Sequence, residues 1–446
     1  MAGIGFELQR ALRGGSLAKA LTVAITGIVI VAGPWLISIV GISVLTGTAS
    51  FVLREAQSLF IGAIVYGYAF SILLFGGLHY IFTRYVSDLL YNGKFHRTTA
   101  ALVLMSIAVL ALSLLIATPF ALALRSPGVS HLGLFRLAMV VFFAAINLIW
   151  IEMLLVTILK GFLTIIGAYL AGMLVSVGAT IWLGRSFGVG GAFLGFSLGQ
   201  LLVALILFAV LLRWNSPTPA LRELRPLLAY AQRYRALMVS GWFYSAGLWI
   251  DKIVFWFSRG ASLQGSFIHL YDGYDQAAYL ANLSVIPVLV FFTIFTETTF
   301  FAALRRLLLK LRTGTYSRIA EEKYGFLRKT RQILLRQSYF HALLVVVLLA
   351  TLPGTLVKIL VIGVLFHMAF LTFFTFLFYI ESYGIALRGS IVFFGVNFLV
   401  SMASARFDAL PPGIGYLLAG LAACIYAGVG LFRNLGELDR IIFRRN

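Results

Sequence analysis

Twelve long apolar runs dominate this sequence, and they constrain the fold more than any other feature. A helix needs roughly 17–25 largely apolar residues to cross the hydrocarbon of a bilayer. Of all residues 61% are hydrophobic and only 11% are charged, whereas soluble domains carry about 25% charged residues. The sequence therefore predicts an all-α membrane protein of about twelve transmembrane helices, near 20-45, 57-82, 99-124, 132-158, 163-183, 191-212, 236-258, 276-303, 338-354, 357-380, 388-405 and 413-432.

Two of these assignments depend on the lengths of the runs. The first run, from Ala20 to about Leu45, is longer than the roughly 7–15 apolar residues of a signal peptide, so we expect a retained first helix. The ninth and tenth runs are separated by only a short stretch around Pro353, Gly354 and Lys358. Two full spans and a re-entrant pair both fit that pattern.

The basic residues are distributed unevenly over the segments between the runs. The chain has 35 Lys and Arg against 15 Asp and Glu, a net charge of +20, which on a soluble protein would suggest a nucleic-acid partner. If the N-terminus is cytoplasmic, 27 of the 35 basic residues lie on the cytoplasmic side, in agreement with the positive-inside rule. We therefore expect a multi-pass protein of the bacterial inner membrane, with both termini in the cytoplasm and no nucleic-acid partner.

The longer interruptions divide the twelve runs into two sets of six. The predicted lobes are 1-212 and 236-446, joined by a cytoplasmic linker at 213-235 in which Pro217 and Pro219 break the apolar pattern. Two halves of equal helix number are typical of transporters. The pattern predicts two six-helix lobes.

A second cytoplasmic segment, the predicted loop 304-337, is strongly basic and alternates its charges with leucines and tyrosines. Such a segment is typical of a basic helix at a membrane interface, where it contacts anionic lipids. Docking of a cytosolic enzyme is the alternative. The candidate contact residues are Arg305, Arg306, Lys310, Arg312, Lys323, Arg328, Lys329 and Arg331.

Two adjacent charges inside the seventh run are the first candidates for a functional site. A charge at the centre of a bilayer costs at least about 2.5–3.5 kcal/mol, so intramembrane charges often mark function. Asp251 and Lys252 point about 100° apart on a helix, so we expect each to seek a partner on another helix, for structure or for transport. On the same run, Trp242, Trp249 and Trp256 recur every seven residues. They form one face for sugar stacking or, alternatively, an interhelical seam.

Four further ionisable residues are candidates for an inner vestibule or a relay. Glu152 and Glu297 lie toward the cytoplasmic ends of the fourth and eighth runs. His79 and His367 are possible proton-relay members because histidine titrates near neutral pH. A histidine that is hydrogen-bonded within a packed bundle is the commoner case.

Two more acids lie at the predicted outer mouth of the second lobe. Asp272 and Asp275 belong to a Tyr-Asp-Gly-Tyr-Asp stretch that could contact a sugar or a cation. A turn built around Asp-Gly explains the same residues. A different pattern, the glycines that recur every four residues at Gly191, Gly195 and Gly199, predicts close helix packing.

Motifs of soluble enzymes and metal sites are missing from the sequence. It contains neither a Walker motif nor HExxH, and its only cysteine, Cys424, lies in an apolar run. The segments between the runs are too short for a soluble catalytic domain. We therefore expect no catalytic residue, no bound metal and no cofactor.

Several stretches spread over most of the chain resemble the PelG family, the membrane transporters of the Pel exopolysaccharide system. They are Ala2-Gly3-Ile4-Gly5-Phe6-Glu7-Leu8-Gln9-Arg10, Gly33-Pro34-Trp35, Trp249-Ile250-Asp251-Lys252, Tyr271-Asp272-Gly273-Tyr274-Asp275, Leu283-Ser284-Val285-Ile286-Pro287 and Thr296-Glu297-Thr298-Thr299-Phe300-Phe301. The family commonly has a second arginine where this chain has Gln9.

The resemblance implies a fold like that of multidrug/toxin extruders (MATE) and lipid-linked oligosaccharide flippases, with two lobes that work by alternating access. It also implies a polysaccharide cargo rich in N-acetylhexosamine and three partners: a PelF-like cytosolic glycosyltransferase and PelD-like and PelE-like membrane proteins. The basic segments 213-235 and 304-337 are candidate docking surfaces for that glycosyltransferase. An ion-coupled multidrug or cation antiporter and a non-conducting scaffold for the glycosyltransferase remain alternatives.

Overall fold

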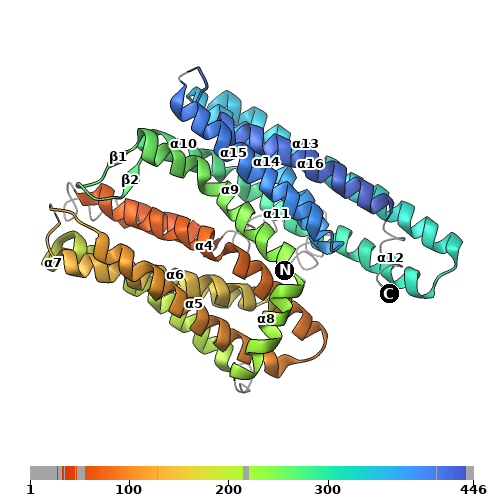
Figure 1. Cartoon of the computed structure of the whole chain (residues 1–446), viewed down its shortest axis with the longest axis horizontal. Helices are drawn as coiled ribbons and strands as arrows, with labels where there is room; N and C mark the ends of the chain where they lie inside the picture. Colours follow the sequence, from red (N-terminus) through yellow and green to blue (C-terminus); the bar gives the residue numbers. More distant parts are fainter. Residues whose placement is uncertain are drawn as a thin grey trace, which may run out of the picture. The chain divides into compact units, whose positions relative to one another are not determined.

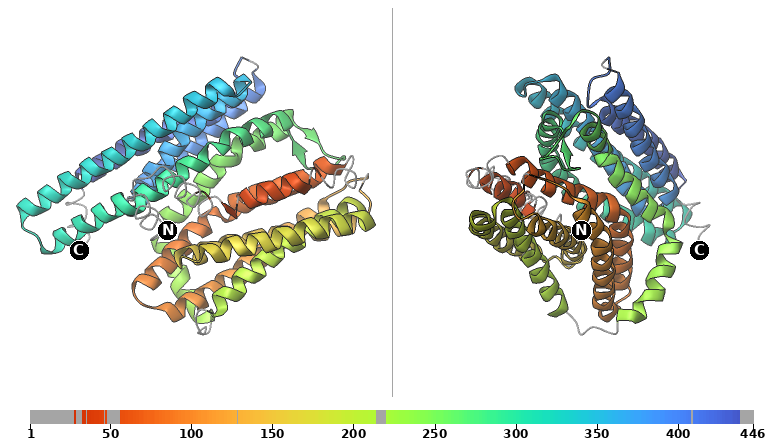
Figure 2. Two further views of the ribbon diagram at one scale, coloured as in Figure 1. Left: turned by 180° about the vertical axis from the view of Figure 1, so that it is seen from behind. Right: turned by 60° about the vertical axis from the view of Figure 1, so that its left-hand side comes forward.

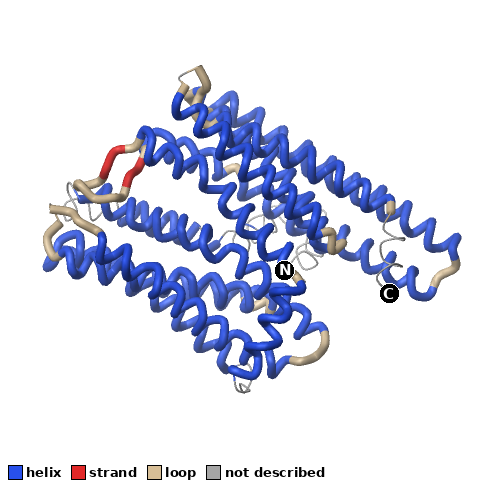
Figure 3. Tube along the Cα trace, viewed as in Figure 1, coloured by secondary structure: helices blue, strands red, loops and turns tan. Residues whose placement is uncertain are grey.

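The protein is almost entirely helical over the part of the chain that the structure describes. The computed structural model describes residues 28, 33–34, 36–45, 47, 56–127, 129–213, 220–407 and 409–437. Figure 1 shows the order of the helices, and Figure 3 shows that the strands of the described residues form one short hairpin. In this antiparallel hairpin, β1 (Ala261–Ser262) pairs with β2 (His269–Leu270). The expectation of an all-α membrane protein is confirmed.

Nine stretches of helix in the described ranges are long and apolar enough to cross a membrane. They are α4 (Gln57–Tyr91), α5 (Phe95–Ala123), α6 (Leu132–Ile158), α7 (Phe162–Arg213), the stretch Asp272–Leu311, α13 (Tyr316–Thr351), α14 (Thr355–Tyr379), α15 (Tyr383–Arg406) and α16 (Ile414–Gly436). The stretch Asp272–Leu311 contains α10 (Asp272–Leu283), α11 (Val285–Phe295), the π-helical turn η3 (Thr296–Phe300) and most of α12 (Phe301–Thr313).

The remaining predicted spans also have a place in the described chain. α7 is 52 residues long and turns at Gly188 (φ 62°, ψ −147°), so it contains both the fifth and the sixth predicted span. The predicted seventh span corresponds to α9 (Arg235–Arg259), which is 25 residues long but is not among the nine stretches apolar enough to cross a membrane, so its place as a span stays a prediction. Of the first span, only a short apolar helix at Leu36–Leu45 is described. The N-terminal and C-terminal segments lie mostly outside the described residues. The location of both termini in the cytoplasm stays a prediction.

The ninth and tenth spans are separate long helices. α13 has 36 residues and ends at Thr351, and α14 has 25 residues and begins at Thr355. Each is long enough to span a bilayer of about 30 Å at 1.5 Å per residue. By length and composition, both helices can therefore be full spans.

The chain forms two compact units that share α9. The N-unit comprises the described residues of Ala32–Trp249 together with Trp256–Tyr271, and the C-unit comprises Ile250–Phe255 together with the described residues of Asp272–Asn446. In the N-unit, α4, α5, α6 and α7 pack together, and in the C-unit α14 packs on both α10 and α16. The predicted lobe boundaries at 1-212, 213-235 and 236-446 stay a prediction.

The glycines of α7 bring its two halves into backbone contact. A Cβ atom on Gly195 would lie 2.4 Å from the backbone nitrogen of Thr180, and one on Gly199 would lie 2.3 Å from the carbonyl oxygen of Gly172. Gly191 approaches the carbonyl oxygen of Leu183 in the same way. The four-residue glycine spacing therefore serves helix packing, as expected.

The basic segment 304-337 is helical, as its alternation of charges with leucines and tyrosines predicts, and its place on the cytoplasmic side stays a prediction. α12 and α13 occupy all of it except a short turn at 314–315, and Figure 2 shows the two helices running side by side from that turn. The alternation of leucines with basic residues suits a helix, because it gives α12 a buried face (Ala303, Leu304 and Leu307) and an exposed basic face (Arg305 and Arg306).

Candidate transport site

A pair of buried charges lies at the centre of the C-unit. Asp251 is 0% exposed and Lys252 is 9% exposed, both on α9. The flexible lysine side chain folds back along the helix, so that its Nζ lies 3.3 Å from both carboxylate oxygens of Asp251. Adjacent positions point about 100° apart on a helix, but the four-carbon stem of lysine spans that angle, so the two charges also contact each other.

Two tyrosines from other helices complete this pair. The hydroxyl of Tyr274, in the first turn of α10, donates a hydrogen bond of 2.6 Å to Oδ2 of Asp251. The ring of Tyr416, on α16, lies with its centroid 5.4 Å from Nζ of Lys252, within the range of a cation–π interaction. The carboxylate and the ammonium thus each have a partner on another helix, as expected for buried charges.

The polar chain continues from Tyr416 to α14. The hydroxyl of Tyr416 shares a hydrogen bond of 2.8 Å with Nδ1 of His367. The imidazole of His367 is stacked on Phe393 of α15, with ring centroids 5.5 Å apart and an interplanar angle of 11°. The structure therefore connects His367, predicted as a possible relay, with the pair Asp251 and Lys252 through one tyrosine.

The two acids of the Tyr-Asp-Gly-Tyr-Asp stretch begin α10 rather than form a turn. Asp272 and Asp275 lie in its first helical turn, where the helix dipole favours negative charge. Asp272 is exposed and Asp275 is half-buried. Tyr274, between them, is the residue of this stretch that reaches Asp251. The sequence placed Tyr274 in a stretch that could contact a sugar or a cation but did not predict its hydrogen bond with Asp251, and Tyr416 had no sequence signal at all.

The predicted tryptophan face lies on the part of α9 that belongs to the N-unit. Trp242 is half-buried and donates a hydrogen bond of 2.9 Å from Nε1 to the carbonyl oxygen of Leu74 on α4. Trp249 is half-buried and lies 6.2 Å from Trp256 between ring centroids. Trp256 is fully buried and stacked on Tyr66 at 4.9 Å. Trp256 therefore belongs to an interhelical seam, whereas Trp242 and Trp249 keep partly accessible rings.

Two ionisable candidates lie in the N-unit and do not belong to the polar chain of the C-unit. Glu152, on α6, is 1% exposed, and its Oε2 has no hydrogen-bond partner among the described residues. His79, on α4, lies with its ring centroid 6.3 Å from that of Trp150. Its Nε2 is buried and likewise lacks a hydrogen-bond partner within the described ranges. Their roles in a vestibule or relay stay predictions.

Two of the remaining candidates fall outside what the structure describes at the level of side chains. These are the side chains of Glu297 and Arg312. The backbone of Glu297 lies in η3, the π-helical turn between α11 and α12. Such turns often occur at functional sites. Of the other basic candidates on α12 and α13, four are exposed and three are half-buried: Arg305, Arg306, Arg328 and Arg331, and Lys310, Lys323 and Lys329.

An ion pair that the sequence did not suggest fastens the predicted linker to the N-unit. Glu223 lies in a short 3-10 helix, η2 (Ala220–Glu223), which precedes α8 (Leu224–Arg233). Nε of Arg97 lies 2.7 Å from Oε1 of Glu223, Nη2 lies 3.0 Å from Oε2, and Tyr85 also donates to this carboxylate. Burial alone would raise the pKa of Glu223, but these hydrogen bonds and the charge of Arg97 outweigh it and lower the pKa below its usual value.

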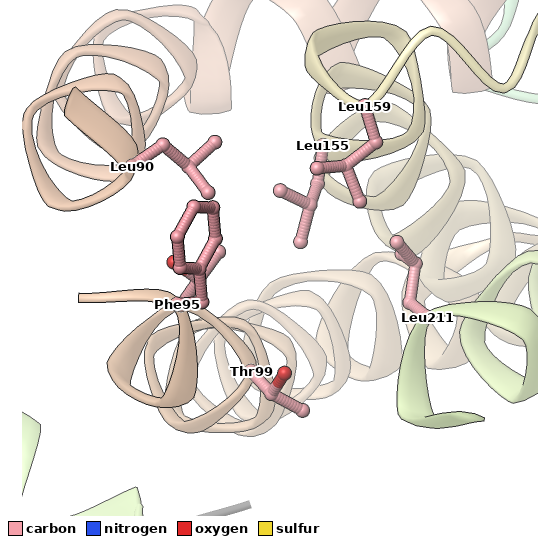
Figure 4. Close-up of a pocket in the computed structure, with 7 residues that line it drawn as sticks. Leu90, Phe95, Thr99, Leu155, Leu159 and Leu211 are labelled. Carbon is pink, nitrogen blue, oxygen red and sulfur yellow. The ribbon is translucent and has the colours of Figure 1, made fainter. Parts of the chain in front are cut away.

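A small recess in the N-unit is too apolar to hold a sugar. Figure 4 shows the leucine and phenylalanine side chains around it. Sugar hydroxyls need hydrogen-bonding partners, and two threonine hydroxyls are the only polar side-chain groups of this lining. The residues that line it are Leu90, Phe95, Thr98, Thr99, Leu155, Leu159 and Leu211.

Solved structures with the same fold are membrane transporters. A MATE transporter of Vibrio cholerae, VcmN in its bent form, is 14% identical with a TM-score of 0.56, and the match covers 94% of this chain and 98% of that one. A MOP-superfamily transporter from Pyrococcus furiosus is 17% identical with a TM-score of 0.54 over 98% of this chain and 99% of that one. The eukaryotic MATE transporter AtDTX14 is 12% identical with a TM-score of 0.57, over 95% and 98%. The fold is therefore the two-lobe fold of the MATE transporters in the MOP superfamily.

Within this class, the sequence gives a more specific assignment. The profile of the PelG family, described as "Putative exopolysaccharide Exporter (EPS-E)", matches residues 1–443. The chain belongs to the PelG family. No curated protein sequence matches it significantly.

Proposed function

We propose that this protein exports a Pel-type exopolysaccharide, rich in N-acetylhexosamine, from the cytoplasm to the periplasm across the bacterial inner membrane. The observation that carries the proposal is a family match over nearly the whole chain together with a buried charge pair on α9, the helix of the predicted seventh span. Intramembrane charges of this kind usually serve transport. The chain moves its cargo by alternating access and catalyses no reaction.

The roles of single residues in this proposal follow their chemistry. Trp242 and Trp249 present partly accessible rings on which sugar faces stack. Asp251 and Lys252 form the polar or coupling site. Asp272 and Asp275 lie at the outer mouth, and Glu297 lies in the inner half of the path. Glu152, His79 and His367 line an inner vestibule or a relay, as the second group of candidates.

Partners are proposed on the cytoplasmic side. A PelF-like glycosyltransferase delivers the growing polymer, and PelD-like and PelE-like membrane proteins hold the assembly together. The exposed basic face of α12 and α13 supplies the docking surface or contacts anionic lipids. Replacement of its arginines and lysines by glutamine is expected to weaken capture of the glycosyltransferase, and unchanged capture would remove docking from the proposal.

Export in inverted membrane vesicles tests the function directly. Vesicles that contain the glycosyltransferase and the two membrane partners are supplied with a radiolabelled nucleotide-activated N-acetylhexosamine, and polymer protected from an added glycosidase is measured. Protected polymer that depends on this chain supports export. If polymer forms at the same rate but stays outside the vesicles with or without the chain, the chain is a scaffold or an antiporter of small molecules instead.

A further inference from the structure

The charge on Asp251 is balanced by the residue next to it in the sequence. Its carboxylate has no exposed surface, and a buried ionised group requires a counter-charge and hydrogen bonds. In a protein that moves material across a membrane, such a carboxylate is the natural binding site for a cation from solution. Here Lys252 supplies the positive charge from within the chain.

The ammonium of Lys252 lies where an external cation would bind. Its Nζ is equidistant from the two oxygens of Asp251, at 3.3 Å from each. The ring centroid of Tyr416 lies 5.4 Å from Nζ of Lys252, and aromatic faces attract cations. The hydroxyl of Tyr274 occupies a further lone pair of Oδ2. The carboxylate of Asp251, the ring face of Tyr416 and the hydroxyl of Tyr274 together could bind one monovalent cation. The ammonium of Lys252 takes the place of that cation.

Neighbouring residues hold the ring of Tyr416 in place. Its hydroxyl is bound to His367, and Phe393 contacts both residues, with ring centroids 5.5 Å from His367 and 6.1 Å from Tyr416. The ring is therefore fixed by two other helices, α14 and α15. The position of the Tyr416 ring beside Lys252 therefore depends on the packing of α14 and α15 in the C-unit.

We propose that Lys252 is a tethered cation that fills a monovalent-cation site formed by Asp251, Tyr274 and Tyr416, so that the unmodified protein takes up neither sodium nor potassium there. A second positive charge beside the ammonium would be repelled strongly in a low-dielectric interior. The covalent tether also gives the ammonium a high effective concentration. The inference deepens the proposed function and rests on it for its meaning in transport: export through this site does not draw on a sodium gradient.

Removal of the tether should restore the site to cations from solution. The full-length protein is purified in detergent, and its unfolding temperature is measured in NaCl, KCl and choline chloride at constant ionic strength. For the unmodified chain we expect the same unfolding temperature in all three salts. For Lys252→Met we expect a sodium- or potassium-dependent rise of roughly 1–2 °C per tenfold increase in the cation once it exceeds its dissociation constant.

Two further variants identify the source of any cation effect. Asp251→Asn combined with Lys252→Met removes both charges, so its unfolding temperature should not depend on the cation. Lys358→Met replaces an exposed lysine on α14 and should behave like the unmodified chain. A Lys252→Met protein that can be purified only in the presence of sodium or potassium also supports the proposal.

Two results would overturn the inference. One is a saturable sodium-dependent rise in the unmodified chain that Asp251→Asn abolishes, because it would show that a cation from solution already binds. The other is a folded Lys252→Met protein without any cation dependence. Neither readout involves polymer, so a failure here leaves the export proposal standing, and a failure of export leaves this result unchanged.

Discussion

Two carboxyl groups buried in long helices, one in each unit, have opposite surroundings. In the C-unit, Asp251 has a lysine and a tyrosine within hydrogen-bonding distance. In the N-unit, Glu152 is equally buried, yet its Oε2 has no hydrogen-bond partner among the described residues. An acid in an apolar run therefore identifies a candidate functional position. The residues that the fold places beside this acid decide whether its charge is already compensated. A carboxylate that is paired with a cationic side chain is already neutralised, whereas an unpaired one can bind a ligand or a proton.

The largest effect is expected from breaking the compensated pair. Lys252→Met leaves Asp251 buried without its counter-charge, which typically costs about 3–5 kcal/mol of stability. Unfolding by heat or denaturant, in choline chloride, measures this loss. The double variant with Asp251→Asn should recover most of it, because no uncompensated charge remains. Equal stabilities of the single and double variants would contradict the pairing.

Close backbone packing between the two halves of α7 is a second feature of the N-unit. Gly195→Ala places a Cβ within 2.4 Å of the backbone of α7, and such overpacking typically costs about 1–3 kcal/mol. Gly178→Ala is the matched control on the same helix, since a Cβ there meets no atom within 4 Å. Unfolding measurements on both variants should separate them. If the two alanines had the same effect, the two halves of α7 would not be in contact.

The N-unit does have a compensated carboxylate, but it lies in the linker outside the spans. Glu223→Gln weakens the pair with Arg97, and we expect a loss of about 1–2 kcal/mol at pH 7. Because folding lowers the pKa of Glu223, its contribution is complete above the ordinary value of 4.5 and is lost as the pH falls through the lowered value. The stability difference between the unmodified chain and Glu223→Gln should therefore shrink below about pH 4.5.

An exposed acid provides the control for that titration. Glu321, on α13, is exposed, and Glu321→Gln should change the unfolding free energy by less than about 0.5 kcal/mol. A difference for Glu223→Gln that stays constant down to pH 3 would show that the linker is held by packing rather than by its ion pair.

Among the buried carboxyl groups, the smallest effect is expected at Glu152 of the N-unit. Glu152→Gln keeps the shape of the side chain, and Oε2 of Glu152 has no hydrogen-bond partner among the described residues, so no interaction of that atom is lost. The unfolding free energy should change by less than about 1 kcal/mol. A loss comparable to that of Lys252→Met would show that Glu152 has a strong ionic partner, and the contrast between the two units would disappear.

The sequence was sufficient for the fold class because apolar length and charge asymmetry are local properties. It also located Asp251, Lys252 and His367, since ionisable residues are rare in such runs. It could not bring them together, because the link depends on Tyr274 and Tyr416, and a tyrosine in a membrane helix is common in packing and at interfaces. The ion pair between Arg97 and Glu223 joins residues 126 positions apart. A local sequence pattern cannot predict a contact between residues so far apart in the chain.

The segment 304-337 was predicted as a basic interfacial helix, and the structure divides it between two helices, α12 and α13. Its high charge resembles that of a loop, yet the spacing of its buried residues is helical, as at Leu304 and Leu307. Charge indicates which face meets water, while the three- to four-residue spacing of the buried positions indicates the structure.

Export by an Asp251→Asn variant tests the central claim most directly. Labelled N-acetylhexosamine polymer that reaches the protected lumen of inverted vesicles is measured at equal amounts of the unmodified and variant chains, with equal capture of the glycosyltransferase. We expect the variant to lose most export while polymer synthesis continues. Export at the unmodified rate would remove the buried pair from the transport path. It would favour a scaffold that acts by binding the glycosyltransferase at its cytoplasmic surfaces.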